Sequence, residues 1–281
     1  MRSKKRRATA PLEAAAARVG VGLVSIRLAS IGLVSIGLAL IAPTVAAQSG
    51  GTEVPLAVVG GRLAVTVHDA DGAAFVFALT TGSPVTVLTE STARALGPGA
   101  RLDLGGFPVR LDHAETIPDE RLVSGGTAFA GMVGVNTLGD FDILLDAPGG
   151  RLVLQPVGPT VSWPGTPLSD PLPVRVYHGV VIGLDVRLNG REFQAMLDLG
   201  TPQLVVNEGA RPDGLTGAEG TASLALGGVT LEGLPLRVRD LPVFERWDPN
   251  NRGFVLVGAA IAYDCAVSLS WAHGEMRTCL R

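Results

Sequence analysis

Two short segments combine residue types that can hold a side chain in place for acid/base chemistry. They are Thr80-Thr81-Gly82-Ser83 and Asp198-Leu199-Gly200-Thr201, and each follows an apolar run. The glycine gives the backbone room for a tight loop, and the hydroxyl in the fourth position can hydrogen-bond to the side chain in the first. Only the second segment has a carboxylate in that first position. The pair therefore offers one general acid/base group and one alcohol.

The alcohol of Thr80 cannot replace a second carboxylate. Two carboxylates held close together can share one proton, so that one activates a water as a base while the other acts as an acid. A threonine hydroxyl stays protonated, and it can orient a water without exchanging a proton with it. A general acid/base group contributes about 10²–10⁴-fold to a rate. We therefore expect Asp198 and Thr80 to occupy the two positions of a degenerate catalytic pair.

The elements that position these segments are repeated along the chain. An offset of 118 residues aligns six positions, which are Gly61 with Gly179, Gly72 with Gly190, Phe75 with Phe193, Leu79 with Leu197, Gly82 with Gly200 and Pro84 with Pro202. Further on, LDLGG at 102–106 matches LALGG at 224–228, and MVG at 132–134 matches LVG at 256–258. Matched motifs in the same order indicate a duplicated unit.

A proline-rich segment at 155–174 separates the two copies. Its six prolines disfavour both a helix and a central strand. We therefore divide the chain into a first lobe at 48–160 and a second lobe at 161–281.

Composition and local pattern favour many short strands. The chain has 37 glycines and 19 prolines in 281 residues, which interrupt apolar runs at short intervals. Strands are expected in the apolar runs between 54 and 89 and between 180 and 207. One helix is expected over 89–97, begun by a Thr89 or Ser91 cap and ended by Gly97. The sequence thus predicts an all-β fold.

The first 47 residues have the pattern of an export signal. A basic start is followed by an apolar run at 28–42 and by small residues ahead of Gln48, so we expect cleavage after Ala47. An uncleaved membrane anchor over about residues 19–42 is the alternative. Arg27 interrupts that stretch, and the apolar run that remains is shorter than the roughly 20 residues of a spanning helix. The mature chain is therefore expected to be periplasmic or extracellular.

Removal of this segment makes the chain acidic. Seven of the 23 basic residues and one of the 26 acidic residues lie in it, which leaves 16 and 25, a net charge of −9. Such a chain repels nucleic acid and anionic lipid, so neither is an expected partner.

Both cysteines lie near the end of the chain, on either side of a predicted hairpin turn at WAHGE. Residues at equal distances from such a turn lie opposite each other, and an exported chain meets oxidising conditions. We therefore predict a Cys265–Cys279 disulfide. The four histidines show no ligand spacing with each other or with the cysteines, so no metal and no cofactor are expected.

The two loop segments and the repeated segments resemble those of the pepsin/retropepsin superfamily of aspartic peptidases, especially its bacterial exported members with two retropepsin-like halves. FALTTGSPVTVL (77–88) and AMLDLGTPQLVV (195–206) match the family's apolar strand that ends in Asp-Thr-Gly-Ser/Thr. Residues 131–154 and 253–271, with Gly134 and Gly258, match its later apolar-apolar-glycine segment. The resemblance spans nearly all of 54–281. It implies two retropepsin-like β-barrel lobes related by pseudo-two-fold symmetry, with Thr80 and Asp198 facing each other at the seam.

The chain departs from the family pattern in three ways. Thr80 stands where the family has its first aspartate. Leu199 stands where the family has a threonine whose hydroxyl braces the opposite loop, so mutual bracing should be weaker. A flap hairpin is expected within 104–122, but the tyrosine that pepsins place there is missing.

These features together predict an aspartic peptidase-like protein with an interlobe cleft for a peptide or an unfolded polypeptide, and with impaired catalysis. We expect it to be a monomer. The alternative is an active aspartic endopeptidase that uses Asp198 with an unconventional acid, and a structural envelope protein is also left open. A serine hydrolase is not supported, because the sequence contains no G-x-S-x-G motif.

Overall fold

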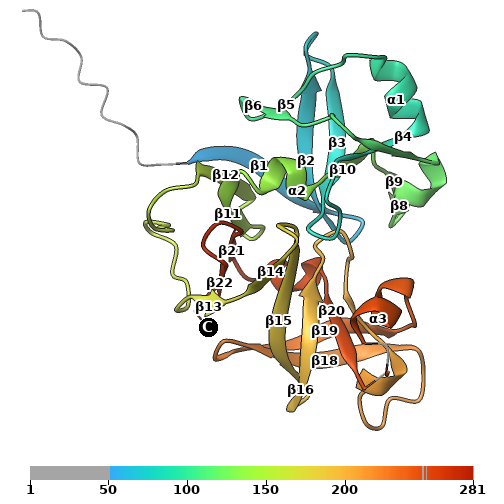
Figure 1. The fold of residues 1–281 in the computed structure, drawn as a ribbon, viewed down its shortest axis with the longest axis vertical. Helices are drawn as coiled ribbons and strands as arrows, with labels where there is room; N and C mark the ends of the chain where they lie inside the picture. Colours follow the sequence, from blue (N-terminus) through green and yellow to red (C-terminus); the bar gives the residue numbers. More distant parts are fainter. Residues whose placement is uncertain (1–50, 249, 251, 281) are drawn as a thin grey trace, which may run out of the picture. The chain divides into compact units, whose positions relative to one another are not determined.

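The computed structural model describes residues 51–248, 250 and 252–280, and it is mainly β. The predicted export signal at 1–47 lies outside these residues. None of the helices in the described ranges is long and apolar enough to cross a membrane. Figure 1 shows the chain coloured from its first to its last residue.

The first half of the chain contains twelve strands, two short α-helices and one 3-10 helix among the described residues. They are β1 (Thr52–Val59), β2 (Arg62–Asp69), β3 (Ala74–Leu79), β4 (Val87–Thr89), α1 (Glu90–Leu96), β5 (Leu102–Leu104), β6 (Phe107–Val109), β7 (Glu115–Ile117), η1 (Asp119–Leu122), β8 (Val123–Ser124), β9 (Thr127–Ala128), β10 (Gly131–Val133), α2 (Val135–Leu138), β11 (Phe141–Asp146) and β12 (Arg151–Pro156).

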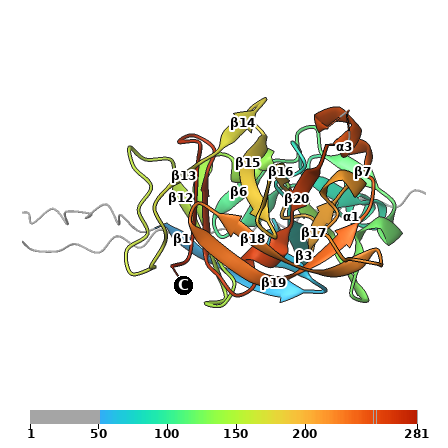
Figure 2. The same cartoon turned by 90° about the horizontal axis from the view of Figure 1, so that it is seen from below.

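The second half follows a similar order. It comprises β13 (Leu172–Pro173), β14 (Arg175–Tyr177), β15 (Val181–Leu188), β16 (Arg191–Leu197), β17 (Leu204–Val206), η2 (Glu208–Ala210), β18 (Glu219–Leu226), β19 (Val229–Val238), α3 (Pro242–Trp247), β20 (Phe254–Val257), η3 (Ala259–Ala262), β21 (Val267–Ser270) and β22 (Glu275–Thr278). Figure 2 shows β18 and β19 as a long hairpin.

The sequence repeat reappears as a repeat of strand pairing. In the first half the strands pair in the order β2-β3-β10-β4-β7, and in the second half in the order β15-β16-β20-β17-β19. In both, the second and third strands are parallel and the third and fourth are antiparallel. Ala78 pairs with Met132 just as Met196 pairs with Leu256, which are the positions that the offsets of 118 and 124 align. The prediction of an internal repeat is therefore confirmed in the strand register.

The matched glycine pairs also lie in equivalent turns. Gly105 and Gly106 join β5 to β6, and Gly227 and Gly228 join β18 to β19. All four have positive φ, between 52° and 93°, where a side chain is disfavoured. This accounts for the conserved spacing of LDLGG and LALGG within the chain.

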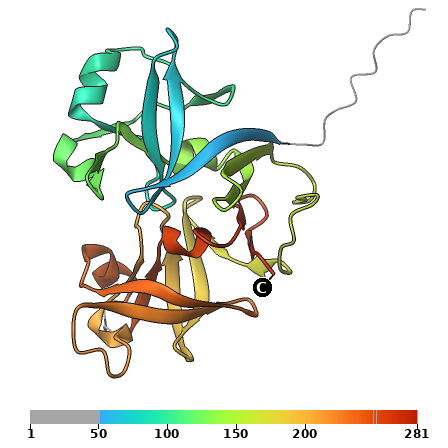
Figure 3. The same cartoon turned by 180° about the vertical axis from the view of Figure 1, so that it is seen from behind.

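Strands from both halves share one sheet. Its order is β13-β22-β21-β11-β12-β1, so β11 of the first half pairs directly with β21 of the second. The first residues of β1 pair with β12 and its last residues pair with β2, so that β1 connects this sheet to the strands around Thr80. Figure 3 shows β1 running between the two groups of strands.

The proline-rich segment packs against this shared sheet. Trp163 and Leu168 lie on Leu144 and Val153 of the first half and on Ala266 of the second. The indole N–H of Trp163 donates to Ser268 Oγ, 2.6 Å away. As predicted, the segment contains no helix, and β13 is a two-residue strand at the edge of the sheet.

The predicted helix and disulfide are both present. Helix α1 begins after Thr89, whose side chain accepts a hydrogen bond from the Thr92 amide, and it ends at Gly97 with φ 71°. Thr89 rather than Ser91 is therefore the cap. Cys265 and Cys279 form the predicted disulfide beside the β21–β22 hairpin, with their Cα atoms 5.4 Å apart.

Candidate functional site

The structure brings Thr80 and Asp198 together. The Thr80 hydroxyl donates a hydrogen bond to Asp198 Oδ1 over 3.0 Å. Thr80 follows β3 and is buried, and Asp198 follows β16 and is partly exposed. Two residues 118 positions apart thus meet where the two equivalent strands end.

Equivalent hydrogen bonds hold the two loops. The Thr80 amide donates to Val133 O over 3.1 Å, and the Asp198 amide donates to Val257 O over 2.9 Å. Just beyond the accepting residues, Gly134 and Gly258 lie against the backbones of the two loops. A Cβ on either would come within 2.2 Å of a carbonyl oxygen, that of Val85 or that of Gln203. The two glycines therefore allow the close approach that fixes each loop.

Three donors converge on the Asp198 carboxylate. Oδ1 accepts from the Thr80 hydroxyl and from the Gly200 amide, the latter over 2.8 Å, and Oδ2 accepts from the Thr201 hydroxyl over 3.0 Å. A carboxylate has only acceptor sites, so all three bonds suit its ionised form. In the described part of the chain, no hydrogen bond joins Asp198 to a second carboxyl group.

Each loop's glycine faces the key side chain of the other loop. A Cβ on Gly82 would lie 2.5 Å from Asp198 Cγ, and a Cβ on Gly200 would lie 2.6 Å from Thr80 Oγ1. Gly82 is exposed and Asp198 is partly exposed, so this contact lies near the protein surface. The reciprocal arrangement explains why both segments have glycine in their third position.

The bracing by the second-position residues of the two loops is one-sided. Thr81 is fully buried, and its hydroxyl donates to Leu197 O over 2.9 Å and accepts from the Leu199 amide over 3.1 Å. Leu199 has no hydroxyl with which to return these bonds, and its side chain is fully buried in the main hydrophobic core. Packing replaces hydrogen bonding on that side.

The two fourth-position hydroxyls behave differently. Thr201 binds Asp198, as the sequence predicts. Ser83 instead donates to Val85 O within its own loop, 2.7 Å away. The expected bond to the first position is therefore absent from the first loop, where that position holds an alcohol instead of a carboxylate.

Sequence reasoning missed Arg62 and Tyr263. Arg62 Nη1 donates to Gly200 O, and the Tyr263 hydroxyl bridges Gly61 O and Pro202 O, so both side chains connect the two halves beside Asp198. Burial lowers the pKa of the Arg62 guanidinium, and the negative charge of Asp198 opposes that shift. Burial raises the pKa of Tyr263 to about 12, against the effect of nearby Arg62. Neither residue belongs to a motif. The only local signal in the sequence is the double glycine before Arg62, which is typical of a turn.

A second hairpin, outside the range predicted for the flap, lies next to this arginine. The range 104–122 contains the turn of the β5–β6 hairpin, β7 and η1, and the hairpin that contacts the turn before Arg62 is β8–β9 at 123–128. Ser124 Oγ donates to Gly60 O over 2.6 Å. Gly125 fits against Gly60 so closely that a Cβ on Gly125 would lie 2.6 Å from Gly60 Cα. The turn between β1 and β2 is therefore held by the β8–β9 hairpin.

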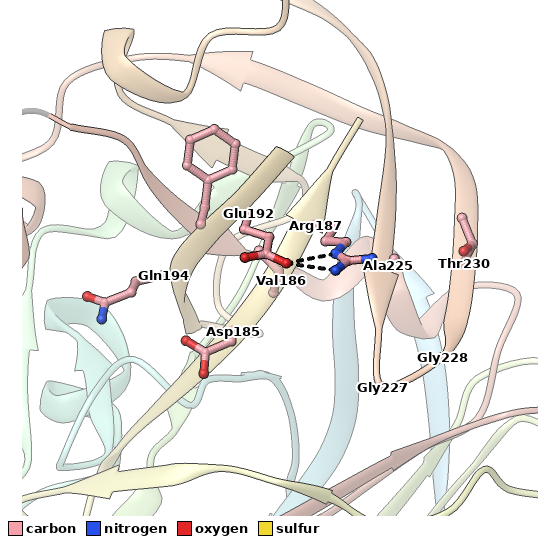
Figure 4. A pocket seen from close by; sticks show the side chains of 10 residues that line it. Asp185, Val186, Arg187, Glu192, Gln194, Ala225, Gly227, Gly228 and Thr230 are labelled. Atoms are coloured by element: carbon pink, nitrogen blue, oxygen red, sulfur yellow. Dashed lines mark hydrogen bonds and ion pairs between the residues drawn. The ribbon is translucent and has the colours of Figure 1, made fainter. Parts of the chain in front are cut away.

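A hollow lies away from the Thr80–Asp198 site, on the second half of the chain. It measures about 680 Å³ and is lined by residues of β15, β16, β18 and β19, among them Asp185, Arg187 and Glu192 (Figure 4). Arg187 pairs with Glu192 over 2.7 Å, and Asp185 pairs with Arg175 over 2.6 Å. These charges compensate one another, and neither Thr80 nor Asp198 lines the hollow.

No group of three His, Cys, Asp or Glu side chains in the described ranges has the arrangement of a metal site. The Thr80–Asp198 site therefore consists of one carboxylate, three hydroxyls from Thr80, Thr81 and Thr201, and the Arg62 guanidinium. Such a set can bind polar backbone groups, and Asp198 supplies its only carboxylate.

Comparison with known proteins gives a similarity in structure. No protein-family model and no curated protein matches the sequence. The fold is similar to that of an aspartic proteinase from Irpex lacteus, with 14% sequence identity over 81% of this chain and 96% of that one, and a TM-score of 0.48. A similarity at this level says nothing about catalysis in this chain.

Proposed function

We propose that this chain is an exported, aspartic peptidase-like protein that binds polypeptide and does not hydrolyse it efficiently. The observation that carries the proposal is the 3.0 Å hydrogen bond from the Thr80 hydroxyl to Asp198 Oδ1. It puts an alcohol at the position where proton exchange requires a second carboxylate.

The architecture behind this proposal is a pair of retropepsin-like β-barrel lobes related by pseudo-two-fold symmetry. Its support is the repeated strand order, the matched register at Met132 and Leu256, and the reciprocal contacts of Gly82 and Gly200. In such an arrangement the two loops lie at the floor of a cleft between the lobes. We place the bound polypeptide over Gly82 and Asp198, the exposed and partly exposed members of the site.

Loss of chemistry does not require loss of binding. An extended polypeptide is held chiefly by backbone hydrogen bonds and side-chain packing, and neither needs a second carboxylate. Hydrolysis does need a base to activate water and an acid to protonate the departing group. The site retains Asp198 as a base, and Thr80 does not supply the acid.

The test combines hydrolysis and binding in one set of proteins. Wild type and Asp198→Ala are incubated with an unfolded protein substrate between pH 3 and 7, and binding of the same substrate is measured in parallel. We expect binding by the wild type, and cleavage no faster than that of Asp198→Ala. Cleavage by the wild type that disappears in Asp198→Ala would instead establish an active endopeptidase with an unconventional acid.

A further inference from the structure

Arg62 crosses from the start of β2 to the loop that carries Asp198. Its Nη1 donates to Gly200 O and lies 3.9 Å from the sulfur of Met132. The side chain is partly buried, and burial lowers the pKa of its guanidinium. A cation in such a place is costly unless its donors find partners.

Most of these donors have no partner within the described part of the protein. A guanidinium presents five N–H donors, and Nη1 provides the only hydrogen bonds that Arg62 makes there. Nε is buried without an acceptor. Nη2 also makes no hydrogen bond, and it is not among the buried unpaired atoms. Nη2 is therefore the nitrogen that is available to an acceptor from outside.

Asp198 does not use this edge. Its two oxygens already accept three hydrogen bonds from Thr80, Gly200 and Thr201. The negative charge of Asp198 favours the charged form of Arg62, but the two side chains form no ion pair within 4.0 Å. Other arginines in the described residues do form close ion pairs. The attraction between Arg62 and Asp198 is long-range, and the N–H groups of Nη2 remain free for a charge-assisted hydrogen bond to another acceptor.

We infer that Arg62 is an anchor for a carboxylate on the bound polypeptide. The inference rests on the proposed function, because it assigns chemistry to the ligand of the same site. A carboxylate next to Arg62 accepts a hydrogen bond from Nη2 and compensates the partly buried charge. Its two sources in a polypeptide are the chain's own C-terminus and an aspartate or glutamate side chain.

Four related peptides distinguish these sources. One parent sequence is made with a free C-terminus or a C-terminal amide, and with glutamate or glutamine at an internal position. Binding is measured by calorimetry to the wild type, to Arg62→Gln and to Arg239→Gln. Arg239 is exposed, so its replacement matches the change in net charge without touching the site. Near-ultraviolet circular dichroism establishes that each variant is folded.

We expect the wild type and Arg239→Gln to bind one carboxylate form about tenfold more tightly than its amide counterpart. Arg62→Gln should bind both forms equally, at the weaker affinity. The pair of peptides that shows the preference identifies the source of the carboxylate.

Equal binding of all four peptides by the wild type overturns the inference and leaves polypeptide binding intact. A preference that persists in folded Arg62→Gln overturns it as well. If the wild type binds none of the four, the proposed function itself fails, and that result is distinct from a loss of preference.

Discussion

The Thr81 hydroxyl accepts a hydrogen bond from the Leu199 amide, 3.1 Å away, while it donates to Leu197 O over 2.9 Å. Both contacts cross between the loop after β3 and the loop after β16. The position opposite Thr81 holds leucine, which has no hydroxyl, so Thr81 makes both of these bonds and Leu199 contributes packing instead. The Thr81 hydroxyl thus adds to the Thr80–Asp198 hydrogen bond in holding the two loops together.

Thr81→Val should therefore destabilise the protein. The valine has a similar shape but leaves the Leu199 amide buried without its acceptor, which costs about 1–3 kcal/mol. Urea unfolding followed by tryptophan fluorescence measures the change. Thr66→Val is the matched control, since Thr66 is an exposed residue of β2 and its replacement should change stability by less than about 0.5 kcal/mol. Equal effects of the two substitutions would show that the Thr81 hydroxyl does not tie the loops.

Gly82→Ala should disturb the contact between the loops without removing a hydrogen-bonding group. The new methyl group would lie 2.5 Å from Asp198 Cγ and 2.7 Å from both carboxylate oxygens, so the Asp198 side chain must move away from position 82. Crowding of this kind costs about 1–3 kcal/mol. Differential scanning calorimetry compares it with Gly217→Ala, where the nearest atom to the added Cβ is 3.9 Å away. An unchanged melting temperature for Gly82→Ala would contradict the close approach of the two loops.

The sequence predicted the strands, the repeat and the Thr80–Asp198 pairing because each depends on a pattern that recurs along the chain. Offsets of 118 and 124 located Gly82 against Gly200 and Gly134 against Gly258, and the strand register follows the same offsets. Arg62 and Tyr263 could not be found in this way. Their importance comes from contacts between the halves, and these depend on tertiary packing rather than on local sequence.

The contact between the β1–β2 turn and the β8–β9 turn could not be predicted either, because it also depends on tertiary packing. The double glycines at 60–61 and 125–126 lie in two turns with positive φ, but nothing in the sequence pairs one turn with the other. Their contact arises because the β8–β9 hairpin and the β1–β2 hairpin pack together. Short polar hairpins such as β8–β9 also carry too little hydrophobic pattern to be located before the fold is known.

The Cys265–Cys279 disulfide should contribute measurably to stability. It joins residues 14 positions apart, and in the chain-entropy model a loop of that length stabilises the folded state by about 3 kcal/mol. The double variant Cys265→Ala/Cys279→Ala should unfold at lower urea concentration than the wild type. Dithiothreitol should lower the midpoint of the wild type and leave that of the variant unchanged. A wild-type midpoint that does not respond to complete reduction would contradict this contribution.

Tyr263 should make the protein less stable at high pH. Burial raises its pKa from 10.0 to about 12, so between these values the unfolded chain loses the phenolic proton while the folded chain keeps it. The unfolded state then binds fewer protons, and the free energy of unfolding falls as the pH rises from about 10 to about 12. Below pH 10 the full contribution is present.

The chain contains only two tyrosines, which makes this prediction easy to isolate. In Tyr177→Phe, the absorbance of the phenolate at 295 nm reports Tyr263 alone, and its midpoint in the folded protein should lie well above 10. Urea unfolding of Tyr263→Phe should lose the corresponding decrease in stability between pH 10 and 12. A midpoint near 10 in folded Tyr177→Phe would refute the assigned burial of this phenol.

The role of Thr80 can be tested by restoring the missing group. Peptide hydrolysis by Thr80→Asp is compared with hydrolysis by the wild type and by Thr80→Asn, which has nearly the same size as aspartate but no acid. With two carboxylates at the 3.0 Å contact, Thr80→Asp should cleave an unfolded substrate at acidic pH at least about 10²-fold faster than either protein. Addition of Asp198→Asn should abolish that gain. A folded Thr80→Asp protein that cleaves no faster than Thr80→Asn would contradict the claim that position 80 lacks only its acid.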